Sequence, residues 1–281
     1  MVQTLGPDHL KLRGEVRRHY DSLVTAYALL WGEHIHHGYW DLGRAPSPPY
    51  GAKAHGAVQE RLIQELVQFA GIQSGSRIAD IGCGIGGSTR WLGQNAGCRG
   101  VGISISARQL LEARRRGPAG ACWIQADAAR LPLRPGSCDA AWIVECSEHL
   151  LDRPAFFGEC ARVVRPGGNL ALAAWLRTPD GSPELLQRVE SAFLIAPLLT
   201  AEEYLTAMSE AGWSDAAWRD ITPNVAPTWD ICIAQTERLW VRSVLPWLPE
   251  PVRSFVAAFH DIRRAYREGA MCYGLFRGTR A

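Results

Sequence analysis

Ile78-Ala79-Asp80-Ile81-Gly82-Cys83-Gly84-Ile85-Gly86-Gly87 is the most informative run of residues in this chain. It is a short apolar segment that carries one acid and then breaks into glycines. Positions without a side chain let the backbone turn tightly after a strand and approach a ligand closely, and the next helix begins with free N–H groups that face the ligand. The run therefore predicts a strand, a ligand-binding loop and a helix.

A glycine-rich loop of this kind occurs in NAD, FAD and S-adenosylmethionine (SAM) sites. The acid just before the first glycine, Asp80, suits a ligand with a cationic ammonium better than one with a pyrophosphate. Dinucleotide sites also place a ribose-binding acid about 20 residues further on. Here the second strand ends instead in Gly102-Ile103-Ser104-Ile105-Ser106. We therefore interpret the loop as a SAM site.

Strand-like and helical patterns alternate around the loop. Strands are expected at 77–81, 99–103, 121–125, 138–145 and 169–175, the last after a turn at 165–168. Further along the chain we expect helices at 183–193 and 200–211, a strand at 213–222, helical structure over 227–268 and a final strand at 271–280. Strands separated by helices predict an α/β fold, with a Rossmann-like, doubly wound, mostly parallel sheet.

This pattern also suggests how the chain is divided. Residues 1–56, with a helix over 8–31, are expected to form an N-terminal helical lid. Residues 57–281 are expected to form the SAM-binding core, and helical elements around 183–212 and 227–268 to cap the substrate.

Composition narrows the class of protein. The chain has 281 residues, 47% apolar and 21% charged, and a formal net charge of +2, which does not favour nucleic acid as a partner. No apolar run reaches the roughly 18 residues of a membrane span, and no secretory signal begins the sequence. Eight cysteines without a Cys-x-x-Cys pair indicate reduced thiols. We expect a cytoplasmic enzyme that acts on a small molecule as a monomer or homodimer.

At this point the chain resembles the class I SAM-dependent methyltransferases and, more narrowly, the γ-tocopherol methyltransferase-like group. The resemblance is carried by the glycine loop and by residues 30–40, 102–109, 126–132, 145–149 and 220–229.

The resemblance implies a set of cofactor contacts. The methionyl part of SAM would be held by Asp80, Gly82, Gly84 and Gly86. The ribose and adenine would be contacted by Ser104, Ile105 and Gln109, although Ser104 replaces the acid that is commoner in the superfamily. Asp127 would accept a hydrogen bond from the adenine amino group, and Ala128 would offer its backbone N–H to the adenine ring. A helix cap at a strand end is the alternative for Asp127.

The segment Glu145-Cys146-Ser147-Glu148-His149 follows the fourth strand, where open α/β sheets bind their ligands. We expect Glu145 to face SAM, and Glu148 and His149 to face the acceptor as catalytic residues. His149 is the preferred base because the pKa of an imidazole lies near neutrality. The alternatives are a helix N-terminal acid for Glu148 and a packing imidazole for His149.

The N-terminal residues complete the expected site. Tyr20, Tyr39 and Trp40 would close over SAM and the acceptor, with helix packing as the alternative. The residues expected at the acceptor are Trp31, His37, Tyr39, Trp40 and Trp229. His34, His36 and His37 have no acid or cysteine at a spacing that completes a metal site, so no metal is expected.

Together these features predict a SAM-dependent methyltransferase of specialised metabolism with a hydrophobic acceptor, aromatic or prenylated. Eleven tryptophans favour such an acceptor. The alternatives are a small-amine N-methyltransferase or a natural-product sugar O-methyltransferase and, from a different class, a NAD-binding oxidoreductase. The sequence leaves open whether carbon, nitrogen or oxygen is methylated.

Overall fold

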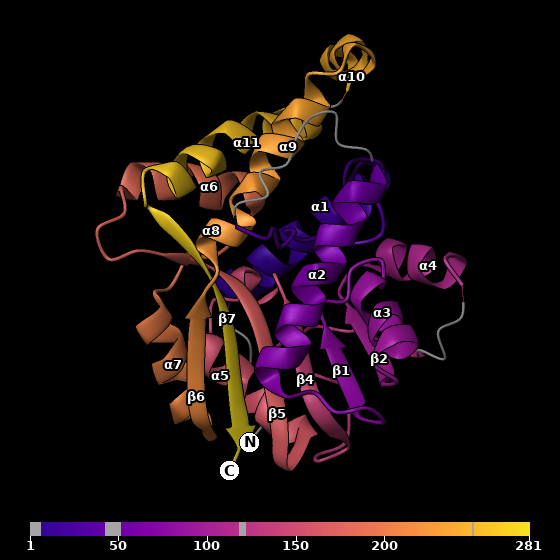
Figure 1. The fold of residues 1–281 in the computed structure, drawn as a ribbon, viewed down its shortest axis with the longest axis vertical. Coiled ribbons are helices and arrows are strands. Elements are labelled where there is room, and N and C mark those ends of the chain that lie inside the picture. Colours follow the sequence, from indigo (N-terminus) through magenta and orange to yellow (C-terminus); the bar gives the residue numbers. More distant parts are fainter. Residues whose placement is uncertain (1–6, 43–51, 118–121, 249) are drawn as a thin grey trace.

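The computed structural model describes residues 7–42, 52–117, 122–248 and 250–281, and in this part of the chain seven strands form one sheet (Figure 1). The order is β3-β2-β1-β4-β5-β7-β6, and β7 runs antiparallel to both of its neighbours. The predicted doubly wound, mostly parallel sheet is confirmed. Ala121, the first residue of the strand expected at 121–125, lies outside the described residues. The strands are β1 (Arg77–Ile81), β2 (Arg99–Ser104), β3 (Cys122–Gln125), β4 (Cys138–Val144), β5 (Val164–Arg177), β6 (Trp213–Asp220) and β7 (Met271–Arg280).

The helices follow the predicted pattern closely. They are α1 (Pro7–Trp31), α2 (Ala52–Ala70), α3 (Gly87–Asn95), α4 (Ala107–Arg115), α5 (Arg153–Val163), α6 (Pro183–Phe193), α7 (Ala201–Glu210), α8 (Thr222–Val225), α9 (Pro227–Thr236), α10 (Leu239–Val244) and α11 (Glu250–Arg267), with short 3₁₀ turns η1 (Ser147–His149) and η2 (Leu245–Trp247). Local capping explains two of the starts. The Ser106 hydroxyl accepts a hydrogen bond from the Gln109 N–H, and Thr200 and Glu203 form a full capping box.

Both faces of the sheet are covered by helices. Side chains alternate along a strand, so Ala140 and Trp142 of β4 belong to the core under α2 and α3. Ala141 and Ile143 face the opposite way and belong to the core under α5 and α7. The strands therefore read as continuous apolar runs, as expected for a sheet buried on both sides.

The turn predicted at 165–168 is an irregularity inside β5 rather than a boundary before it. Val164 already pairs with Cys138 of β4, and the pairing resumes at Asn169 opposite Ala140. Gly167, with φ of +70°, allows the intervening residues to bulge out of the ladder. The expected strand start at 169 was therefore five residues too late.

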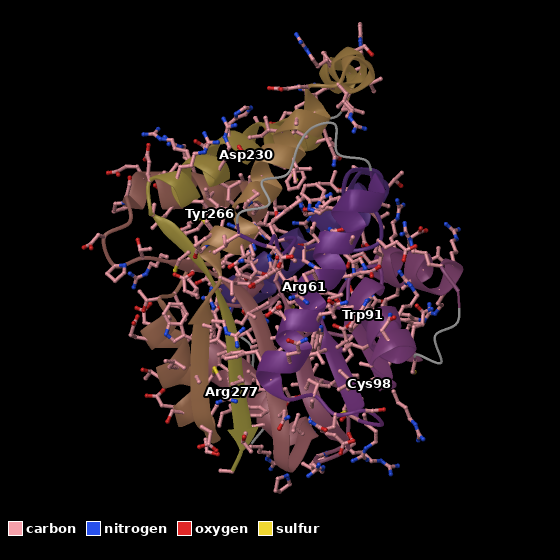
Figure 2. All side chains as sticks on the ribbon, in the orientation of Figure 1. Arg61, Trp91, Cys98, Asp230, Tyr266 and Arg277 are labelled. Atoms are coloured by element: carbon pink, nitrogen blue, oxygen red, sulfur yellow. The ribbon has the colours of Figure 1, made fainter. Side chains whose placement is uncertain are left out.

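A helical cap lies over the carboxyl edge of the parallel strands, and Figure 1 shows α6, α9 and α11 crossing this end of the sheet near α1. Ion pairs tie the cap together, because Asp230 of α9 (labelled in Figure 2) contacts Arg263 at 3.5 Å and Arg267 at 2.8 Å on α11. Within the region around 183–212, however, α7 packs against β6 and α5 rather than in the cap. The expected boundary at 56 falls inside α2, which lies on the sheet.

None of the helices in the described residues combines the length and the apolar character that crossing a membrane requires.

Candidate functional site

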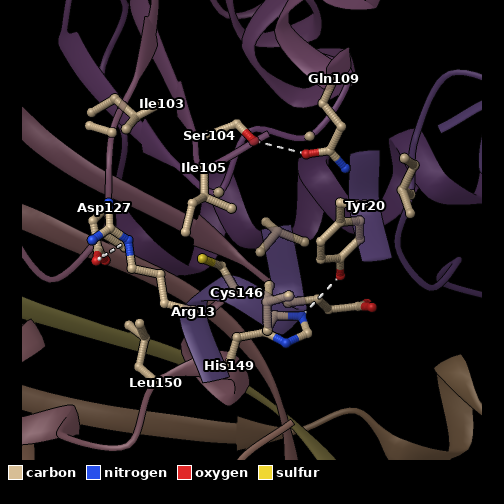
Figure 3. A pocket seen from close by; sticks show the side chains of 18 of the residues that line it. Arg13, Tyr20, Ile103, Ser104, Ile105, Gln109, Asp127, Cys146, His149 and Leu150 are labelled. Carbon is tan, nitrogen blue, oxygen red and sulfur yellow. Dashed lines mark hydrogen bonds and ion pairs between the residues drawn. The ribbon is translucent and has the colours of Figure 1, made fainter. Parts of the chain in front are cut away.

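The carboxyl ends of β1, β2 and β4 border an open cavity of about 810 Å³, which we call cavity 1 (Figure 3). Ligands of open α/β sheets bind at this edge, where the strand order switches direction. Most of the predicted cofactor residues line cavity 1, namely Tyr20, Gly82, Gly84, Ser104, Ile105, Gln109, Asp127, Ala128 and Glu145.

Ser104 and Gln109 act as a pair in cavity 1. The Ser104 hydroxyl donates to Gln109 Oε1 at 2.8 Å and accepts from the Ser106 N–H at 3.1 Å. These bonds orient the Gln109 amide, whose nitrogen lies 3.9 Å from the point where a Cβ on Gly84 would stand. The Gln109 amide nitrogen is thus directed at the glycine loop as a donor for a ligand, and Ser104 positions it.

Asp127 is held by helix α1. Its Oδ2 lies 3.0 Å from Arg13 Nε and 3.4 Å from His9 Nε2, and its Oδ1 accepts from the Ala129 N–H at 2.9 Å. Figure 3 shows the Arg13 side chain reaching this acid across the cavity. Asp127 therefore closes a turn after β3, where no helix begins, and also lines cavity 1.

The glycines of the loop differ in what surrounds them. A Cβ on Gly82 would stand 2.4 Å from Cys146 Sγ, and one on Gly86 would stand 2.2 Å from the Trp123 ring. Gly86 lines none of the three cavities described here, and its lack of a side chain makes room for the Trp123 ring. Gly84 has φ of +53°, and within the described part of the chain the nearest atom to its would-be Cβ outside the adjacent residues lies 3.9 Å away. Gly84 is the glycine that leaves room for a ligand.

Asp80 faces a smaller cavity of about 320 Å³, cavity 3, on the other side of the loop. Burial raises the pKa of Asp80 to about 7, although the Thr89 hydroxyl donates a hydrogen bond that favours the carboxylate. Sequence reasoning missed Gly87 and Ser88 here. The lining residues are Glu33, His34, Ile35, His36, Asp80, Gly82, Cys83, Gly84, Ile85, Gly87, Ser88 and Val144.

The cap and α1 enclose a third space, cavity 2, of about 520 Å³, and its walls are mostly aromatic. The predicted residues Trp31, His37, Glu148, His149 and Trp229 all line it. Cavity 2 is lined by Tyr20, Tyr27, Trp31, Ile35, His36, His37, Glu145, Glu148, His149, Trp175, Phe193, Ile195, Thr228, Trp229 and Phe255.

Tyr39 and Trp40 lie elsewhere, and neither lines a cavity described here. The Tyr39 N–H donates to the Val58 carbonyl at 2.7 Å, and the Trp40 N–H donates to the Asn224 carbonyl at 2.9 Å. These bonds join the N-terminal segment to α2 and α8. The lid role expected of Tyr39 and Trp40 stays a prediction, and in this structure their backbone is bound to α2 and α8.

His149 presents a nitrogen lone pair at the junction of cavities 1 and 2. Its Nδ1 lies 2.9 Å from the Leu194 carbonyl, which can only accept, so Nδ1 carries the proton. Its Nε2 lies 2.9 Å from the Tyr20 hydroxyl and accepts from it (Figure 3). Burial lowers the pKa of His149, so the ring is neutral at physiological pH.

Glu148 is almost fully buried and anchored to the sheet. Its Oε1 accepts from the Trp175 N–H at 2.7 Å, and Oε2 accepts from the Ser147 hydroxyl at 3.3 Å. Burial raises the pKa of Glu148 to about 7. Its side chain lines cavity 2 but is fixed by the backbone of β5, so it has less freedom than His149 to follow a reacting group.

Four residues line both cavity 1 and cavity 2: Tyr20, Ile35, Glu145 and His149. Ile35 also lines cavity 3, so all three spaces meet beside it. Sequence reasoning missed Ile35 as well as Tyr27, Phe193 and Phe255. Tyr27 could have been found, because its spacing places it on the same face of α1 as Tyr20 and Trp31. Phe255 has no such feature in the sequence.

Among the described residues, no group of three or more His, Cys, Asp or Glu side chains is arranged to hold a metal ion. His34 and His36 are buried, and burial lowers the pKa of both rings.

Comparisons with known proteins identify the family to which this chain belongs. A family described as a methyltransferase domain matches residues 79–172. The chain is 27% identical to a chloroplastic tocopherol O-methyltransferase of Arabidopsis thaliana, over 94% of this chain and 81% of that protein. It is 30% identical to the 27-O-demethylrifamycin SV methyltransferase of Amycolatopsis mediterranei, over 76% of this chain and 79% of that protein.

One solved structure shows the same fold over nearly the whole length. It is a geranyl diphosphate C-methyltransferase from Streptomyces coelicolor in complex with Mg²⁺, geranyl diphosphate and S-adenosyl-L-homocysteine (SAH). It aligns with a TM-score of 0.73 at 20% identity, covering 96% of this chain and 98% of that one. The chain is a SAM-dependent methyltransferase of class I and belongs to the γ-tocopherol methyltransferase-like group.

Proposed function

We propose that this methyltransferase transfers the methyl group of SAM to a hydrophobic small molecule, aromatic or prenylated, that binds in cavity 2. The observation that carries the proposal is the junction of an aromatic cavity with the cofactor cavity at Tyr20, Ile35, Glu145 and His149. Aromatic walls are typical of sites for ligands of this kind, and the polar groups placed among them include Glu145, Glu148 and His149. The seven Phe, Trp and Tyr side chains in these walls favour such an acceptor over a small polar amine or a sugar.

The shape of the site supports the placement of SAM. A sulfonium sulfur carries three substituents, and three cavities meet beside Ile35. The adenosyl group would occupy cavity 1 and the methionyl group cavity 3, with the methyl pointing into cavity 2. Buried His36 Nε2 has no hydrogen-bond partner among the described residues. His36 lines cavities 2 and 3, where a ligand donor would satisfy this nitrogen.

SAM supplies a methyl carbon that its sulfonium makes electrophilic. The aromatic walls and Ile35 would hold the acceptor in line with that carbon, and such alignment contributes about 7–11 kcal/mol in well-oriented reactions. For a hydroxyl acceptor, Nε2 of His149 would take the proton as the bond to carbon forms. The Tyr20 hydroxyl, which donates to Nε2 at 2.9 Å, would first give way to the acceptor hydroxyl.

Helix α1 and residues 32–42 would serve as the lid. His9, Arg13, Val16 and Tyr20 all project from α1 into cavity 1. Arg13 also holds Asp127, so an adenine group bound to Asp127 would compete with this tether of α1. This proposal keeps the N-terminal lid expected from the sequence but assigns Tyr20 and Ile35, rather than Tyr39 and Trp40, to its inner surface.

The test of the proposed function is incubation with labelled SAM and a panel of prenylated phenols, prenyl diphosphates, indoles, amines and glycosides. We expect label in a hydrophobic product that is aromatic or prenylated. Such a product would fit an enzyme of specialised metabolism, and the names of the tocopherol and rifamycin methyltransferases point to acceptors of this kind. Transfer only to small polar amines or to sugars would contradict it.

SAM affinity should depend on pH through Asp80. Because burial raises the pKa of Asp80 to about 7, the carboxyl is protonated below that pH and must lose its proton to bind an ammonium. Calorimetry should show SAM affinity falling by up to about tenfold per pH unit below pH 7 and constant above it. His34 in the same cavity has its pKa lowered by burial to about 2 and does not titrate there.

Asp80→Asn provides the control for this dependence. It should bind SAM weakly and show no pH dependence between pH 6 and 8. A variant that kept the slope would assign the titration to another group.

Asp127→Ala should weaken SAM binding by about 1.5–3 kcal/mol, because it removes an ionised acceptor of the adenine amino group. The affinity for the acceptor should change little. Arg13→Ala separates this role from the tether to α1, since it removes the 3.0 Å ion pair but keeps the carboxylate. Equal losses of SAM affinity in both variants would mean that Asp127 acts only by holding α1.

A further inference from the structure

Glu145 has an unusual backbone at the point where cavities 1 and 2 meet. It directly follows β4 and adopts φ of +50°, a conformation that residues other than glycine seldom take. Its N–H donates to the Ala173 carbonyl of β5 at 2.9 Å, which holds the main chain in place. Strain of this kind persists where the surrounding structure enforces it, commonly at functional sites.

One oxygen of the Glu145 carboxylate is saturated by protein donors. Oε1 accepts from the His37 N–H at 2.8 Å, from His37 Nδ1 at 2.9 Å and from the Tyr273 hydroxyl at 2.8 Å. The Trp229 indole donates to His37 Nε2 at 2.8 Å, so that nitrogen is unprotonated and Nδ1 carries the proton. Residues from three separate parts of the chain therefore fix the direction of this carboxylate.

The other oxygen is left for a ligand. Oε2 makes no hydrogen bond or ion pair with any described residue, and the side chain is 11% exposed at the cavity junction. Burial favours the protonated acid, but the interactions with His37 outweigh it and lower the pKa of Glu145 to about 2. No Lys or Arg is among the described residues that line cavity 2, and the Arg13 of cavity 1 pairs with Asp127.

We propose that Oε2 of Glu145 is a charge selector, which favours the cationic sulfonium of SAM over the neutral thioether of its product, SAH. The inference rests on the proposed cofactor site. As the acceptor oxygen forms its bond to the methyl carbon, the carbon–sulfur bond breaks and its electron pair returns to sulfur, which becomes neutral. The acceptor proton passes to His149 Nε2. The attraction between Glu145 and the cofactor is then lost, which favours release of the product.

The test compares the dissociation constants of three ligands by calorimetry: SAM, SAH and sinefungin, which carries an ammonium near the position of the sulfonium. Glu145→Gln should weaken SAM and sinefungin by about 10- to 100-fold, as expected for loss of one nearby charge in a partly shielded site. SAH should bind nearly as it does to the wild type, and that binding also shows that the variant is folded.

Two matched variants separate charge from hydrogen bonding. Tyr273→Phe removes one of the three donors to Oε1 but leaves the charge, and Glu145→Asp keeps the charge on a shorter side chain. Both should retain the wild-type ratio of SAM to SAH affinity, even if both affinities fall. Glu145→Asp also remains informative if Glu145→Gln does not fold, because loss of the ratio there would overturn the inference.

Equal weakening of all three ligands in Glu145→Gln would overturn the charge selector and leave Glu145 as a structural residue. A wild-type protein that bound neither SAM nor SAH would instead contradict the proposed cofactor site. The two failures are therefore distinguishable in the same experiment.

Discussion

Gly84→Val should strongly weaken SAM binding while the chain still folds. Among the described residues, no atom beyond the adjacent residues lies within 3.9 Å of the would-be Cβ of Gly84, so a branched side chain there would occupy the room left for the ligand. Overpacking costs about 1–3 kcal/mol even where neighbours can adjust, and a rigid cofactor adjusts less than a side chain. We therefore expect calorimetry to show SAM and SAH affinity reduced by at least about 10- to 100-fold.

Gly75→Val is the matched control. Gly75 also has a positive φ, +84°, and no atom within 4 Å of its would-be Cβ, but it precedes β1 and lines no cavity described here. Both variants should lose stability from backbone strain, of order 1–3 kcal/mol. Only Gly84→Val should lose the ligand. Unchanged SAM affinity in Gly84→Val would show that the cofactor does not approach this loop.

His149→Ala should lower kcat by about 10²–10⁴-fold for an acceptor that must lose a proton, with little change in SAM affinity. The reason is position: Nε2 carries a lone pair at the cavity junction, and Nδ1 is held by the Leu194 carbonyl at 2.9 Å. Because burial lowers the pKa of His149, wild-type activity should be constant through neutral pH and fall only in acid. The rate of the variant should partly recover at high pH, where the acceptor ionises unaided.

His19→Ala serves as the control for loss of a buried imidazole. His19 hydrogen-bonds the Tyr27 hydroxyl at 3.0 Å and lines none of the described cavities, so its loss should change stability rather than the pH profile of kcat.

Glu148→Gln extends the test to other acceptors. If the acceptor is an alkene, methylation generates a carbocation, and Glu148 rather than His149 should then control the rate. Wild-type kcat at every pH in both His149→Ala and Glu148→Gln would leave alignment alone as the source of catalysis.

Local sequence patterns determined the architecture of this chain. The glycine run after 77–81 marked the first strand and its loop, and strand-helix alternation placed most of the other strands within a few residues. The caps at Ser106 and Thr200 are equally local, because each cap residue and its partner lie three residues apart. Such features depend on backbone chemistry over a few neighbouring residues, so the sequence alone could specify them.

Tertiary packing decided which of the predicted site residues line the cavities. Tyr39 and Trp40 sit in the same segment as Ile35 and His37, yet they pack against α2 and α8 while Ile35 and His37 line the cavities. Gly86 looked equivalent to Gly84, but the Trp123 ring of β3 fills its space. An irregular segment has no periodicity, so its sequence does not show which way each side chain turns.

Cavity 2 could be seen only in the tertiary structure. Its walls come from α1, residues 32–42, β5, α6, α9 and α11, and Trp229 reaches His37 across 192 positions of sequence. Periodicity reveals that a helix has a buried face but not the surface against which that face packs. The sequence alone therefore determined the sheet, the cofactor loop and the acids near it. The relative placement of the helices over the sheet edge decided the acceptor cavity, because contacts between distant segments depend on the packing of the whole chain.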